Sequence, residues 1–121
     1  MPTTPYESGD VVLIPFPFTD LTTIKYRPAL VVSSGRFNRA QEDIIAVAIT
    51  SAFARKNKAG HYEYALEERE RQEAHLLYPS LVKLAKIVTI DKRLVRKHLG
   101  ALSSRTTKII IKRVRDILRV G

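Results

Sequence analysis

Short apolar runs rich in β-branched residues alternate with polar segments along the first half of the chain. The first run covers residues 11–14, and we expect Pro15 and Pro17 to stop it because proline cannot donate to a sheet ladder. Residues 27–33 and 43–51 follow as a second and a third strand. The third run is apolar on both faces, which predicts a central position in the sheet.

The middle of the chain predicts two further strands around a charged segment. Residues 61–66 alternate as a half-exposed strand does, and residues 80–90 predict a long strand that bends near residues 85–86. Residues 67–74 are charged at nearly every position, which indicates a loop or a short exposed helix.

The end of the chain predicts a short strand and a helix. The strand covers residues 95–99, before Gly100, and the helix begins at Ser103 or Ser104. Apolar residues then recur at helical spacing, with cations on the other faces. The whole pattern predicts one α+β domain over residues 1–121, with a curved, mostly antiparallel sheet of five or six strands and a C-terminal helix.

Composition narrows the class of protein. A chain of 121 residues without cysteine cannot use disulfides or thiolate chemistry, and the absence of cysteine fits a reducing cytosol. No window approaches the roughly 18 consecutive apolar residues of a membrane span. The N-terminus lacks the features of a secretion signal. We therefore expect a cytoplasmic protein that makes no membrane contact.

Positive charge is concentrated in the last third of the chain. The net charge is +9, and residues 81–121 carry twelve cations and two anions. This asymmetry favours a polyanionic partner, either nucleic acid or an acidic protein. A solubilising surface explains the charge equally well before any motif is considered.

Five blocks in the right order resemble the MazF/PemK family of toxin ribonucleases. The first block spans residues 9–31. It begins with Gly-Asp-Val at residues 9–11, continues with a proline-rich segment and ends with Arg-Pro-Ala-Leu-Val at residues 27–31. The later blocks are residues 46–51, 79–83, 87–94 and 99–103. The resemblance implies an SH3-like barrel of the CcdB/MazF type, assembled as a homodimer and blocked by an acidic antitoxin protein.

The same resemblance assigns catalytic roles to Arg27 and to Thr50, which ends the third strand. RNA can be cleaved by attack of its own 2′-hydroxyl on the neighbouring phosphate. The site must then take the proton of that hydroxyl, stabilise the extra negative charge on the phosphate and protonate the departing 5′-oxygen. A guanidinium suits the phosphate because its planar fork makes two charge-assisted bonds. Without the resemblance, Arg27 is more readily interpreted as a surface cation, and Thr50 as a good strand residue.

Further candidates surround this pair. Ser51 and His61 are second choices for catalysis or phosphate binding, whereas His75 and His98 are more readily interpreted as solvated or structural histidines. No pair of histidines has metal-ligand spacing, and no carboxylate cluster suits magnesium, so neither a metal nor another cofactor is expected.

The segment between the first two strands is the expected RNA-reading loop. Its candidate contacts to bases are aromatic, polar and cationic side chains, namely Phe18, Thr19, Asp20, Lys25 and Tyr26. Packing is the competing role for the phenylalanines of this segment.

The resulting hypothesis is a sequence-selective, metal-independent endoribonuclease that acts as the toxin of a type II toxin–antitoxin system. It would cut single-stranded RNA and leave 2′,3′-cyclic phosphate and 5′-hydroxyl ends. Two alternatives stay open: a gyrase-binding toxin of the same fold without catalysis, and a basic barrel that binds nucleic acid without cutting it.

Overall fold

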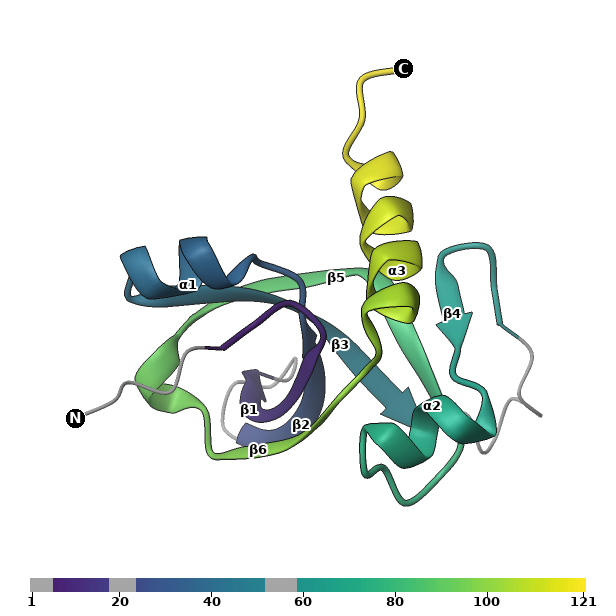
Figure 1. Cartoon of the computed structure of the whole chain (residues 1–121), viewed down its shortest axis with the longest axis horizontal. Helices are drawn as coiled ribbons and strands as arrows, with labels where there is room; N and C mark the ends of the chain where they lie inside the picture. Colours follow the sequence, from purple (N-terminus) through teal and green to yellow (C-terminus); the bar gives the residue numbers. More distant parts are fainter. Residues whose placement is uncertain (1–5, 18–23, 52–58) are drawn as a thin grey trace.

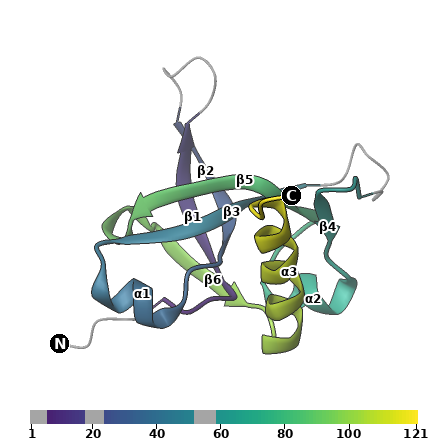
Figure 2. The same ribbon diagram turned by 90° about the horizontal axis from the view of Figure 1, so that it is seen from above.

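A single antiparallel sheet organises the chain in the computed structural model, which describes residues 6–17, 24–51 and 59–121. Its strands follow the order β4-β5-β3-β2-β1-β6. One end of the molecule carries α1 and the other carries β4 and α2, with α3 beside them (Figures 1 and 2). The elements are β1 (Asp10–Pro17), β2 (Ile24–Val31), α1 (Gly35–Ala40), β3 (Asp43–Ser51), β4 (Glu63–Ala65), α2 (Glu68–Glu73), β5 (Ser80–Asp91), the 3-10 helix η2 (Lys92–Leu94), β6 (Lys97–Ala101) and α3 (Ser104–Ile117).

The predicted α+β fold is confirmed in its main elements. β3 has the predicted bounds and pairs with a strand on each side, so it is central. The bend in β5 is also present, because the register against β3 jumps from Ile87 to Val82 opposite Val47 and Ile49. Ser103 caps α3, since its side chain accepts a hydrogen bond from the backbone N–H of Thr106.

The first strand runs through its prolines, contrary to the sequence expectation. β1 pairs with β2 as far as Pro17, but its pairing with β6 ends at Leu13. The carbonyl of Leu13 accepts from Arg96 N at 2.8 Å, so this residue faces the β6 side. Pro15 and Pro17 repeat that orientation, because alternate residues of a strand face the same neighbour. Their missing N–H groups therefore point beyond the end of the β6 ladder, where no donor is needed.

Three other boundaries differ from the predictions. β2 begins at Ile24 and ends at Val31, earlier at both ends than residues 27–33. β4 is limited to three residues of the range 61–66. β6 continues through Gly100 to Ala101, whereas the glycine was expected to follow the strand.

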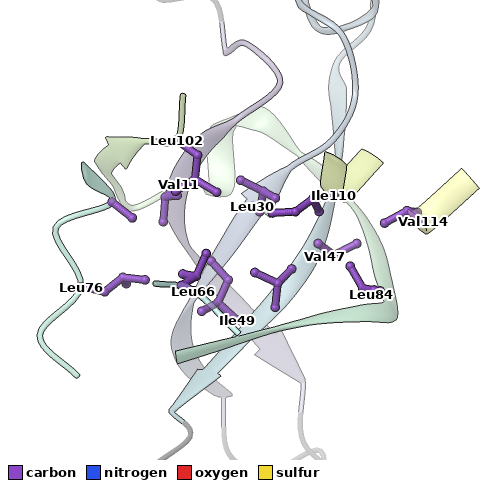
Figure 3. Packing of buried hydrophobic residues seen from close by; sticks show 12 residues of the cluster. Val11, Leu30, Val47, Ile49, Leu66, Leu76, Leu84, Leu102, Ile110 and Val114 are labelled. Atoms are coloured by element: carbon purple, nitrogen blue, oxygen red, sulfur yellow. The ribbon is translucent and has the colours of Figure 1, made fainter. Parts of the chain in front are cut away.

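Two buried clusters occupy the two faces of the sheet. Val11, Leu30 and Val47 belong to the cluster of Figure 3, which also receives Ile110 and Val114 from α3. Their chain neighbours belong to the second cluster, which contains Val12, Ile14, Ala29, Val31, Ile44 and Ala46. Successive strand residues point to opposite faces, so burial on both faces explains the continuous apolar runs in these strands.

A buried carboxylate attaches α2 to its neighbours. Glu70 is 3% exposed, and its side chain accepts hydrogen bonds from the hydroxyls of Tyr64 and Thr106, both at 2.9 Å. It also accepts the backbone N–H of Glu67 at 2.8 Å. The charged segment is thus a helix with an inward-facing anchor, because a buried carboxylate must be hydrogen-bonded.

Candidate active site

A cavity of 480 Å³ opens where β2, β3 and the segment after α2 meet. Arg27 and Pro28 of β2 line it together with Thr50 and Ser51 of β3. The structure therefore brings Arg27 to the same cavity as Thr50 and Ser51, which lie more than twenty residues later in the sequence.

Strand register explains why Arg27 and Thr50 meet. The β2–β3 ladder pairs Ala29 with Ala48, Leu30 with Val47 and Val31 with Ala46. Two further steps of this register align Arg27 with Thr50. Both lie on the same face as the Ala29–Ala48 pair, because side chains repeat every second residue. Ser51, one residue further, lies by the same alternation on the other face with Ile49, and both of these residues also line the cavity.

The far wall of the cavity comes from the segment between α2 and β5. Leu76, Leu77 and Tyr78 line it, and Leu77 is 82% exposed. The segment is held by Arg71, whose guanidinium donates to the carbonyl of Leu76 at 2.6 Å. Its end is fixed by Ser80, whose hydroxyl donates to the carbonyl of Tyr78 at 2.8 Å.

His75 lines this cavity and is exposed, in keeping with the solvated or structural histidine expected from the sequence. Its ring Nδ1 lies 2.6 Å from the backbone carbonyl of Leu99 on β6. Its backbone has a φ of 56°, in the left-handed region. A glycine in a strand often marks the close approach of another backbone, so Gly100 was the one signal in the sequence for this contact.

The expected RNA-reading loop is described only at its β2 end. Lys25 and Tyr26 line the cavity, and the guanidinium of Arg96 lies 4.6 Å from the centre of the Tyr26 ring. Such stacking orients the tyrosine ring at the cavity mouth. Phe18, Thr19 and Asp20 fall outside the described residues.

His61 lies elsewhere, at a second cavity of 520 Å³. Its ring contacts Tyr62 edge-on, with 4.6 Å between the ring centres. Arg113 of α3 lines the same cavity and donates to the carbonyls of His61 and Glu63 at 2.8 and 3.3 Å. The structure does not bring His61 together with Arg27 and Thr50.

A sequence model of the PemK-like, MazF-like toxins of type II toxin–antitoxin systems matches residues 7–118. The chain belongs to this family. Among curated protein sequences, none gives a significant match.

Solved structures of toxins share the fold of this family member. A mycobacterial endoribonuclease solved with its cognate antitoxin is 21% identical, with a TM-score of 0.72 over 96% of this chain and 97% of the other. MazF from Deinococcus radiodurans is 22% identical, with a TM-score of 0.71 over 96% and 98%. The Mycobacterium tuberculosis toxin MazF-mt6 is 14% identical, with a TM-score of 0.66 over 91% and 98%. These likenesses establish the MazF-type, SH3-like barrel.

Two kinds of structural feature are absent from the described residues of this toxin-family chain. No helix there has the length and apolarity needed to cross a membrane. No group of three or more His, Asp or Glu side chains in the described ranges is arranged to hold a metal ion.

Proposed function

We propose that this protein is an endoribonuclease that cuts single-stranded RNA at selected sequences and acts as the toxin of a toxin–antitoxin pair. The observation that carries the proposal is the cavity that Arg27 and Thr50 line together. Family membership supports the toxin role, and a mycobacterial endoribonuclease shares the fold.

The two side chains suit a transphosphorylation centred on one phosphodiester. Arg27 binds the phosphate through its guanidinium, stabilises the charge that grows on the pentavalent phosphorus, and donates a proton to the departing 5′-oxygen. The hydroxyl of Thr50 donates a hydrogen bond to a phosphate oxygen, and Ser51 is a second donor at the rim.

The attacking group in this reaction is the ribose 2′-hydroxyl, so no metal-bound water is required. The products are then a 2′,3′-cyclic phosphate and a 5′-hydroxyl. The cavity supplies cations and hydroxyls for this chemistry, whereas the oxygen ligands that magnesium prefers are carboxylates and carbonyls.

Lys25 and Tyr26 serve RNA recognition in this proposal, together with Phe18, Thr19 and Asp20. An unpaired base can stack on Tyr26, and Lys25 can pair with a neighbouring phosphate. The charge of +9 matches both RNA and an acidic antitoxin that folds on the toxin surface. A cytoplasmic homodimer is part of the proposal, by family resemblance.

Incubation of the purified protein with a long mixed-sequence RNA in EDTA tests the proposal. Discrete fragments are expected, with a shared sequence at their ends. Their 5′ ends should accept phosphate from a kinase without prior phosphatase treatment, and their 3′ ends should need opening of the cyclic phosphate before ligation. Arg27→Ala is the matched inactive control.

Other results would favour the rival functions. An intact RNA that shifts on a gel indicates binding without cleavage, with a log–log salt slope of about −0.7 per neutralised phosphate. Intact RNA combined with trapped DNA–gyrase complexes indicates the gyrase-binding alternative.

A further inference from the structure

The proposed function has not used His75, one of the side chains that line the cavity. Among the described residues that line it, the ionisable ones are Lys25, Tyr26, Arg27, His75 and Tyr78, and none is Asp or Glu. Ammonium, phenol and guanidinium groups ordinarily lose their protons only well above neutral pH. Imidazole is the one type in this set that commonly accepts a proton near pH 7.

The hydrogen bond of His75 determines which ring nitrogen can act. The carbonyl of Leu99 can only accept, so Nδ1 at 2.6 Å carries the hydrogen and donates it. In the neutral ring Nε2 is then the unprotonated nitrogen. No hydrogen bond to Nε2 is present within residues 6–17, 24–51 and 59–121.

The backbone of His75 adopts an uncommon conformation. Its φ of 56° lies in the left-handed region, which few non-glycine residues adopt. Gly100 permits the contact, because a Cβ there would lie 2.5 Å from the carbonyl oxygen of Glu73 and 2.9 Å from His75 Nδ1. Such strained, closely fitted positions cluster at functional sites.

We propose that His75 is the general base of the RNA-cleavage reaction, an inference that rests on the proposed function. Nε2 takes the proton of the 2′-hydroxyl as that oxygen bonds to phosphorus. The P–O5′ bond breaks, and the 5′-oxygen leaves with a proton from Arg27. Proton exchange with water then returns His75 to its neutral form and Arg27 to its cationic form, so the cycle balances.

The variant His75→Asn distinguishes a structural role of His75 from a catalytic role. Asparagine tolerates the left-handed backbone and can donate its side-chain amide to the Leu99 carbonyl, so it keeps the structural contact but has no base. Single-turnover cleavage by His75→Asn should fall about 10²–10⁴-fold. Its affinity for an RNA with a 2′-deoxy residue at the cut site should stay within about threefold of wild type, since proton abstraction plays no part in binding.

Two further measurements sharpen the test. Added imidazole should restore part of the cleavage by His75→Gly, a variant that also suits the backbone. An RNA with sulfur in place of the bridging 5′-oxygen has a leaving group that needs no proton. The defect of His75→Asn should persist on this substrate, and its disappearance would make His75 the acid and overturn the assignment.

The remaining outcomes distinguish this inference from the proposed function. If wild type does not cut RNA, the proposed function fails. If wild type cuts, Arg27→Ala does not, and His75→Asn cuts within about threefold of wild type, only the base assignment fails. A loss confined to RNA affinity in His75→Asn also overturns it, because the histidine would then bind and not catalyse.

Discussion

Two cavities of similar size, 480 and 520 Å³, each contain an arginine and a histidine. In the second, Arg113 holds two backbone carbonyls and the His61 ring packs on its neighbour Tyr62. In the first, His75 binds a carbonyl through one nitrogen and keeps the other for chemistry. Arg27 shares that cavity with the Thr50 and Ser51 hydroxyls, which suit a phosphate.

Residue types alone therefore do not make a cavity catalytic. A guanidinium that donates to backbone carbonyls contributes to stability, whereas one beside hydroxyl donors in an open cavity can bind an anion. The following changes test this distinction between the two cavities, beginning with the largest expected effect.

The two arginines should behave in opposite ways when each is replaced by alanine. Arg27→Ala should lower RNA cleavage by about 10²–10³-fold or more, because an electrostatic donor to the transition state is lost. Arg113→Ala should leave cleavage within about threefold but lower the free energy of unfolding by about 1–2 kcal/mol, since two carbonyls lose their donor. Single-turnover kinetics and urea titrations measure both. A loss of cleavage in Arg113→Ala alone would move the active site to the second cavity.

The hydroxyl of Thr50 should contribute less than the guanidinium. Thr50→Val keeps the β-branched shape of the strand residue and removes one hydrogen bond to a charged phosphate, worth about 1.5–3 kcal/mol. Cleavage should fall about 10–150-fold. Ser51→Ala removes the second hydroxyl that lines the cavity, with a smaller expected loss because the register aligns Thr50, and not Ser51, with Arg27. Equal losses in both variants would contradict the register argument.

Gly100→Ala should disturb the first cavity without changing any of the β2 and β3 residues that line it. The new Cβ would meet backbone atoms of Glu73 and Ala74, so a shift of α2's end should destabilise the fold by about 1–3 kcal/mol. Because this shift would displace His75, the rate of RNA cleavage should fall. The melting temperature measures the loss of stability. Gly121→Ala is the control, because nothing lies within 4 Å of its position. An unchanged melting temperature for Gly100→Ala would refute the close approach.

The smallest effect concerns Tyr64 in β4, the strand that follows His61. Burial, and then its hydrogen bond to the Glu70 carboxylate, raises the pKa of Tyr64 to about 12. An unfolded tyrosine loses its proton near pH 10, so the contribution of Tyr64 to stability is complete below pH 10 and is lost as pH rises towards 12. Urea titrations from pH 9 to 12 should show a steeper loss for wild type than for Tyr64→Phe. Parallel curves would rule out this linkage.

The sheet was the most predictable part of the molecule. β3 matches its predicted bounds, since a long β-branched run buried on both faces has few alternatives as a strand. The Ser103 cap and the bend of β5 follow from equally local signals. The extension of β1 through Pro15 and Pro17 was missed, because whether a strand proline is tolerated depends on how far the neighbouring β6 reaches.

In the candidate site, too, some residues were predicted from local sequence, whereas others depend on long-range contacts. Arg27, Thr50 and Ser51 were found from the sequence because motifs at strand ends carry them, and adjacent strands bring them to one cavity. His61 was favoured over His75 because it opens the predicted fourth strand, where some members of the family are similar, whereas His75 follows the charged segment. Neither position in the sequence reveals what the ring contacts. The choice between them depends on Gly100 and Leu99, more than twenty residues away from His75.

By itself, the sequence determined most strands and the final helix, because apolar periodicity acts over a few residues. Resemblance to the motifs of a family singled out Arg27 and Thr50 as candidates. Only the tertiary structure decided which histidine joins that pair. The contact of His75 with Leu99 depends on how α2 packs against β6, and such long-range packing leaves no local pattern in the chain.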